Sequence, residues 1–238
     1  MIYRENDVCT VINKAQLKKD EIYFFGGYMV SKLCNIRHVR NIDLILNKTP
    51  IKINEFDFNK YFSEPIIKHI VLDRHDIKIV KIQTKCLNNL FNLRFRFFWI
   101  DNFPCTKNNN SLYMTPQNIA VSKYFAQTES PRNYFDFAKH IVDLSILYHT
   151  FGETILLDAL NKLKDYYGRE SGMFPVNIYK ATNRFFENQS QSVKKMEALD
   201  IDSKYHSVIL SGAVGLSKMI REFLNSEKSL RNDMGFDI

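Results

Sequence analysis

Two periodicities divide the sequence. Up to about residue 104, short apolar runs are separated by polar breaks. The run FNLRFRFFWI at 91–100 is the clearest strand pattern, because apolar and arginine positions alternate with a period of two. Beyond residue 112, apolar positions recur at helical spacing instead. The pattern therefore predicts an α+β fold, with a mixed sheet of four or five strands and accompanying helices at 1–111, followed by an α-helical bundle at 112–238.

Apolar spacing and turn residues predict the individual elements. Strands are expected at 42–46, 77–84 and 93–100, and the run at 22–25 is either a strand or a helix end. Helices are expected at 7–19, 28–35, 58–68, 115–128, 132–149, 153–167 and 175–189, before a last pair over 192–225 with a break near Gly212. Pro65 interrupts the helix at 58–68. Thr115 and Pro116 form a helix start, with an N-cap hydroxyl and a proline at the first helical position.

The chain is basic, with 238 residues, a formal net charge of +7 and a pI near 9.1. This charge favours a polyanion such as RNA or nucleotide phosphate as a partner, and it is equally consistent with a solvated basic surface. Hydrophobic residues make up 45% and charged residues 25%, which is ordinary for a globular protein. The length suits one large domain or two small ones.

Cysteine spacing and apolar run length exclude several classes of protein. The four cysteines (Cys9, Cys34, Cys86 and Cys105) form no Cys-x-x-Cys pair, so neither a zinc site nor a disulfide framework is expected. The first residues, MIYRENDVCT, carry charges where a signal peptide has an apolar core. No apolar run reaches the roughly 18 residues that a membrane helix needs. A cytoplasmic location is therefore expected.

The segment FFGGYMVSKLCNIRHVRNIDLILNK at 24–48 carries the candidate chemistry. Gly26 and Gly27 precede a short amphipathic segment, and Asp43 stands inside the apolar run IDLIL. Nucleotidyl transfer needs a tight turn near the phosphates, carboxylates that hold Mg²⁺, and basic residues that neutralise a triphosphate. The order of residues fits this chemistry. It also fits a helix cap followed by an aspartate on an edge strand.

This segment resembles the first motif of the AbiEii-type nucleotidyltransferases, toxins of abortive-infection and toxin–antitoxin systems with a polymerase-β-like fold. In that family a glycine pair and a helix precede Arg-x-Ser-x-Asp-hydrophobic-Asp. Gly26, Gly27, Arg37 and Asp43 match the pattern. Asn41 replaces the first aspartate, and a valine at 39 replaces the serine.

A second resemblance lies downstream and extends the likeness over about residues 20–150. The segment MTPQNIAVSKYFAQ supplies Lys123, which matches a lysine of the family, and KHIVDLSIL supplies Lys139 and Asp143. His140 stands where the family has another aspartate. Without the resemblance, Lys123 is equally a solvated helix lysine. Asp143 is equally the i,i+4 partner of Lys139.

The resemblance implies a role for each matching residue. It implies that the nucleotide-binding residues are Gly26, Gly27, Arg37 and Lys123, and that the catalytic residues are Asp43, Lys123 and Asp143. Mg²⁺ is implied as the cofactor, with Asn41, Asp43 and Asp101 as its ligands. Asp101 is also consistent with a turn, and Asp73 and Asp76 are its rivals.

The implied activity is Mg²⁺-dependent transfer of a nucleotide from an NTP to an acceptor. RNA, and tRNA in particular, is the favoured acceptor, with protein hydroxyls as the other choice. An antitoxin protein is the implied partner. Two alternatives stay open. One is a degenerate relative that binds nucleotide or RNA without turnover, which Asn41 and His140 favour. The other is a protein-interaction module that pairs with an antitoxin.

Overall fold

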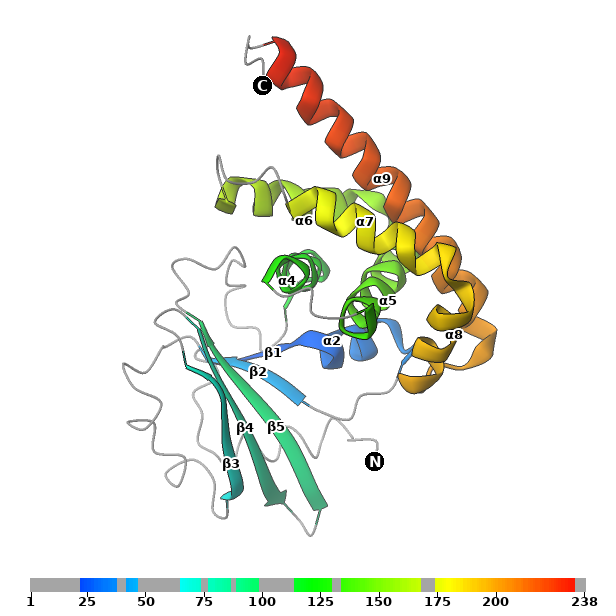
Figure 1. Ribbon diagram of the computed structural model, residues 1–238. Coiled ribbons are helices and arrows are strands. Elements are labelled where there is room, and N and C mark those ends of the chain that lie inside the picture. Colours follow the sequence, from blue (N-terminus) through cyan, green and yellow to red (C-terminus); the bar gives the residue numbers. More distant parts are fainter. Residues whose placement is uncertain are drawn as a thin grey trace. The chain divides into compact units, whose positions relative to one another are not determined.

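The computed structural model describes the backbone of residues 22–37, 42–46, 65–73, 77–86, 89–98, 114–129, 134–167 and 174–233. The chain forms two compact units (Figure 1). One, the sheet unit, comprises Met1–Leu33 and His38–Thr115, and the other, the helical unit, comprises Cys34–Arg37 and Pro116–Ile238. The predicted helix at 7–19, the loop at 104–111 and the predicted domain boundary at 111/112 lie outside the described residues.

The described strands of the sheet unit pair in the order β1-β2-β5-β4-β3. Their bounds are Ile22–Phe25 (β1), Ile42–Leu46 (β2), Pro65–Asp73 (β3), Ile77–Cys86 (β4) and Asn89–Phe98 (β5). β2 and β5 pair parallel, whereas β1 with β2, β3 with β4 and β4 with β5 pair antiparallel. The strands β3, β4 and β5 lie side by side in Figure 1.

The strand predicted at 42–46 is confirmed residue for residue, and 22–25 is a strand rather than a helix end. The helix predicted at 58–68 is wrong where the chain is described, because Pro65 opens β3 instead of interrupting a helix. The run PIIKHIVLD is rich in β-branched residues, which suit a pleated surface. A proline is tolerated as the first residue of a strand, where its missing N–H costs little.

The helix α2 (Gly26–Cys34) starts directly after β1. Gly26 has φ of +69°, a left-handed conformation that glycine adopts without steric cost, and this allows the sharp change from strand to helix. Tyr28, Met29 and Val30 are buried. Asn35 follows the helix with φ of +51°, another left-handed residue, and ends it.

The helical unit contains helices α4 to α9 and one short 3-10 helix in its described part. Their bounds are Pro116–Glu129 (α4), Tyr134–Phe151 (α5), Glu153–Tyr167 (α6), Phe174–Glu187 (α7), Gln189–Ala198 (α8), Ser203–Tyr205 (η4) and His206–Asp233 (α9). Pro116 opens α4 as predicted, and α6 has the predicted bounds. α5 ends at Phe151, and Gly152 directly after it has φ of +82° and donates its N–H to the Tyr148 carbonyl at 2.9 Å. Among the described residues, no helix has the length and apolarity to span a membrane.

The predicted helix break near Gly212 is wrong. The chain turns at 199–205, and α9 runs through Gly212 without interruption. A Cβ at this position would lie 2.6 Å from the backbone oxygen of Ser145 on α5. Glycine is therefore present because the two helices approach closely, not because the helix ends there.

The predicted α+β class needs correction for the part whose side chains are described. These residues are 26–37, 114–125, 138–165 and 175–227, and none of them lies in a strand. The described core is therefore an all-helical one. Its apolar side chains recur at helical spacing and are fully buried, and they include Ile119, Ile141, Leu144, Leu160, Ile178, Phe185 and Ile220.

Candidate functional site

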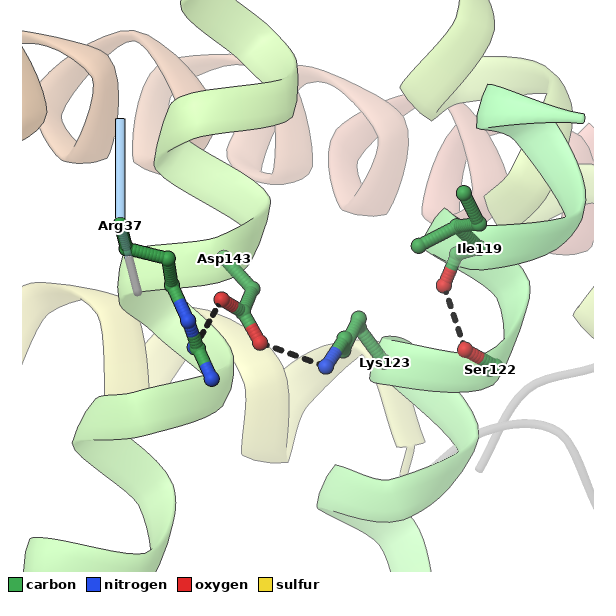
Figure 2. A network of polar contacts seen from close by, with 5 residues as sticks. All are labelled: Arg37, Ile119, Ser122, Lys123 and Asp143. Atoms are coloured by element: carbon green, nitrogen blue, oxygen red, sulfur yellow. Dashed lines mark hydrogen bonds and ion pairs between the residues drawn. The ribbon is translucent and has the colours of Figure 1, made fainter. Parts of the chain in front are cut away.

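A buried carboxylate in the helical unit contacts two cations. Asp143 lies midway along α5, and its side chain is 1% exposed. Its Oδ1 accepts a hydrogen bond from Nη1 of Arg37, and its Oδ2 accepts one from Nζ of Lys123 at 2.5 Å. Figure 2 shows Asp143 between the two cations, each directed at a different oxygen. We call Arg37, Lys123 and Asp143 the charge cluster.

The position of Lys123 follows from the composition of α4. Residues on several sides of this helix are fully buried, namely Ile119, Ala120, Val121 and Tyr124. A lysine at this point cannot extend into solvent, and its side chain is only 5% exposed. Burial of an ammonium group requires a charged partner, and Asp143 supplies it. The Ser122 hydroxyl, next to Lys123, donates to the Ile119 carbonyl at 2.6 Å within the same helix.

Arg37 reaches the cluster from outside the bundle helices. It lies three residues beyond the end of α2, in the segment Cys34–Arg37 that belongs to the helical unit. Its side chain is 10% exposed. Arg37 and Asp143 are 106 residues apart in the sequence, and Lys123 and Asp143 are 20 apart. The cluster thus joins residues from both sequence motifs.

The charge cluster carries a formal charge of +1, because one carboxylate faces two cations. Each carboxylate oxygen has a cationic partner, so the carboxylate acts here as an acceptor for Arg37 and Lys123. Burial raises the pKa of the Cys34 thiol, and the negative charge of Asp143 raises it further.

Two buried hydroxyl groups lie on the helices that carry the cluster. The hydroxyls of Tyr124 on α4 and Ser145 on α5 have no hydrogen-bond partner among the described residues. Burial raises the pKa of Tyr124 well above its ordinary value. Tyr124 therefore stays neutral at physiological pH and contributes no charge beside Lys123.

The sheet unit brings a second set of predicted residues together. Phe25, the last residue of β1, pairs with Asp43 in the β1–β2 register. Gly26 follows Phe25 directly, so the glycine pair starts beside the strand position of Asp43. On the other side, Asp43 pairs with Arg94 of β5. The backbone therefore places the glycine turn next to the candidate metal-binding strand residue.

The other predicted site residues have different outcomes. Lys123 is not a solvated helix lysine, and the contacts of Asp143 include Arg37 and Lys123 across the bundle. Asn41 and Asp101 lie outside the described residues, so the Mg²⁺ ligand set stays a prediction. In the described part of the chain, no three His, Cys, Asp or Glu side chains gather as a metal site.

Sequence reasoning listed Arg37 and Asp143 separately and missed that they pair. One signal was available for Lys123. The lysine interrupts the apolar run IAVSKYF, and a cation in such a run predicts a buried carboxylate partner. No comparable signal marks Arg37, because its partner is distant in sequence and the intervening fold decides the contact.

No family model matches the chain, and no curated protein matches it either. Two solved structures resemble it in fold. One is a candidate nucleotidyltransferase from H. pylori, with a TM-score of 0.49 and 14% identity over 96% of this chain and 99% of that chain. The other is JHP933 from Helicobacter pylori, with a TM-score of 0.49 and 14% identity over 99% of this chain and 100% of that chain. Both likenesses concern the fold alone.

Proposed function

We propose that the chain is a Mg²⁺-dependent nucleotidyltransferase that transfers a nucleotide from an NTP to RNA, with tRNA as the favoured acceptor. The observation that carries the proposal is the charge cluster. Arg37 belongs to the first motif and Lys123 and Asp143 to the second, yet they meet in one buried site. Two motifs that serve one reaction must bring their residues together in space. If Lys123 were only a solvated helix lysine and Asp143 only the partner of Lys139, no such contact would be needed.

The two sets of residues divide the chemistry between them. Arg37 and Lys123 offset the negative charge that develops on the phosphates during transfer. The glycine pair lets backbone N–H groups approach phosphate oxygens. Asp43, with Asn41 and Asp101, would hold Mg²⁺, and the ion would supply charge neutralisation and Lewis-acid polarisation for the phosphates. The carboxylate of Asp43 suits this hard cation, and its register position beside the glycine turn is consistent with the role.

Transfer of label from an α-labelled NTP to total RNA tests the proposal. The wild-type chain should label RNA only when Mg²⁺ is present. Lys123→Met should lower the rate about 100-fold or more, because it removes one charge that stabilises the transition state. Lys164→Met is the matched control, since Lys164 forms a partly exposed pair with Glu227 on α9 and its rate should match wild type. Mg²⁺-independent labelling, or none at all, would refute the proposed activity.

A degenerate relative is the second candidate, and two departures from the family pattern favour it. Asn41 offers an amide oxygen without charge, and His140 replaces an aspartate. Mg²⁺-dependent NTP binding without any transfer of label would identify this case. A toxin role with an antitoxin partner is also part of the proposal, on the strength of the family resemblance. Growth arrest on expression of the wild-type chain, absent in Lys123→Met, tests the toxin role.

A further inference from the structure

The segment Cys34–Arg37, here called the strap, is fixed to α5 at two points. The Cys34 thiol is hydrogen-bonded to the Thr150 hydroxyl, and Arg37 pairs with Asp143. Thr150 and Asp143 are seven residues apart on α5, which is about 10.5 Å at the rise of a helix. The Cys34 end of the strap therefore lies beside the C-terminal part of α5, and the Arg37 side chain contacts the middle of the same helix.

The two fixing points differ in strength. The Thr150 hydroxyl donates to the Ile146 carbonyl at 2.8 Å, and its hydrogen bond to Cys34 lowers the thiol pKa, which makes the sulfur a second acceptor for the same proton. Sulfur is a weak acceptor, so this contact is weak. Arg37 to Asp143 is a charge-assisted contact at a carboxylate that is 1% exposed. The Asp143 end therefore holds the strap. The residues that flank the strap, Leu33 and His38, both belong to the sheet unit.

The two cations of the cluster are also held differently. Lys123 is fixed by α4, a helix of 14 residues whose neighbouring side chains are buried. Arg37 is the last residue of a four-residue segment whose second residue, Asn35, is left-handed. If Asp143 lost its charge, the two cations would repel each other.

We propose that Asp143 is a positioning residue. It fastens the strap to α5 through Arg37 and holds Arg37 and Lys123 as a pair for the phosphates of the nucleotide. Asp143 is then neither a metal ligand nor a proton acceptor. That Asp143 holds the two cations for the phosphates rests on the proposed function, whereas the fastening of the strap does not.

Alkylation of Cys34 by iodoacetamide, followed by peptide mass spectrometry on the full chain, tests the strap without any nucleotide. Arg37→Met and Lys123→Met each remove one cation beside Asp143 and leave a one-to-one ion pair. In both variants the carboxylate of Asp143 has one cation fewer beside it, so its negative charge should raise the pKa of Cys34 further. By charge alone, both variants should therefore slow the alkylation of Cys34. If Arg37 fastens the strap, Arg37→Met should instead speed alkylation about tenfold or more, as expected for the loss of a charge-assisted hydrogen bond. Lys123→Met should not speed it.

The outcomes separate clearly. Faster alkylation in Arg37→Met than in both wild type and Lys123→Met supports the strap. Equal or slower alkylation in Arg37→Met overturns it. Asp158→Asn, at an exposed position on α6, controls for handling and should match wild type. Circular dichroism on each variant separates local release from unfolding.

The positioning role has its own readout in the transfer assay. Asp143→Asn should raise KM for the NTP while the Mg²⁺ concentration for half-maximal activity stays that of wild type. Asp143→Glu should restore part of the affinity, because it restores the charge. A shifted Mg²⁺ requirement in Asp143→Asn would make Asp143 a metal ligand and overturn the role. If the wild-type chain transfers no nucleotide, the proposed function fails, and the alkylation result alone decides the strap.

Discussion

Replacing Gly212 by alanine tests how closely α9 and α5 pack. A Cβ at Gly212 would lie 2.6 Å from the Ser145 carbonyl oxygen, 3.2 Å from its carbonyl carbon and 3.3 Å from its Cβ. Ordinary contact begins at 3.4 Å, so the nearest pair must separate by about 0.8 Å. The oxygen belongs to the backbone of a buried helix, so relief requires α9 to move away from α5.

The expected magnitude combines two opposing effects. Overpacking a core costs about 1–3 kcal/mol. Alanine gains back about 0.8–1 kcal/mol because it favours the helix more than glycine does. The 2.6 Å contact at Gly212 is with backbone, which places the cost in the upper part of the overpacking range, at about 2–3 kcal/mol. The free energy of unfolding should therefore fall by roughly 1–2 kcal/mol. For a domain of this size that corresponds to a Tm lower by about 2–8 °C.

Gly215→Ala is the matched comparison on the same helix. Its Cβ would lie 2.5 Å from Cε1 of Tyr148 and 2.8 Å from the Tyr148 hydroxyl. These atoms are at the far end of a half-buried side chain that can rotate, so the cost should be smaller than at Gly212. Urea unfolding followed by circular dichroism measures both variants. Gly212→Ala as stable as wild type, or less costly than Gly215→Ala, would refute the close-packing argument.

Three further predictions concern the candidate site and its surroundings. Tyr124→Phe removes a buried hydroxyl that has no partner among the described residues, so the free energy of unfolding should stay unchanged or rise by about 1 kcal/mol, and urea unfolding that shows a clear loss would reveal a partner. The pKa of Cys34 is raised from its ordinary 9.0, so its alkylation rate should rise at higher pH than that of a free thiol. The same shift contributes stability to the folded protein that is fully present below pH 9 and is lost as the pH rises through the pKa of the folded state. A midpoint of the alkylation rate against pH at or below that of a free thiol would contradict the raised pKa. Asp43→Ala should abolish Mg²⁺-dependent NTP binding in calorimetric titrations, and Asn41→Asp should tighten Mg²⁺ binding, whereas unchanged binding in Asp43→Ala ends the enzyme hypothesis.

Local sequence determined the elements whose signals are contained within the element itself. The apolar spacing of 153–167 predicted α6 with its bounds, and Pro116 marked the start of α4. The run IDLIL predicted β2 in the same way. These signals depend on side-chain periodicity and backbone restrictions, which act over a few residues and need no tertiary contact.

Sequence also listed candidate site residues, because a charged group in an apolar run is unusual. Asp43 stood out for this reason, whereas Lys123 was listed through the family resemblance. The role of each in catalysis stays a prediction. Local signals failed at Pro65 and Gly212. Proline and glycine are compatible with more than one structure, and their neighbours in space select among these.

Tertiary structure alone decided the pairing of charges. Arg37 meets Asp143 across 106 residues, and nothing local to either residue indicates the other. The same holds for Gly212, where the backbone of Ser145 on another helix leaves no room for a Cβ. The physical reason is that burial makes a charge or a close contact depend on whatever packs opposite it, and packing partners are set by the whole fold rather than by sequence neighbours.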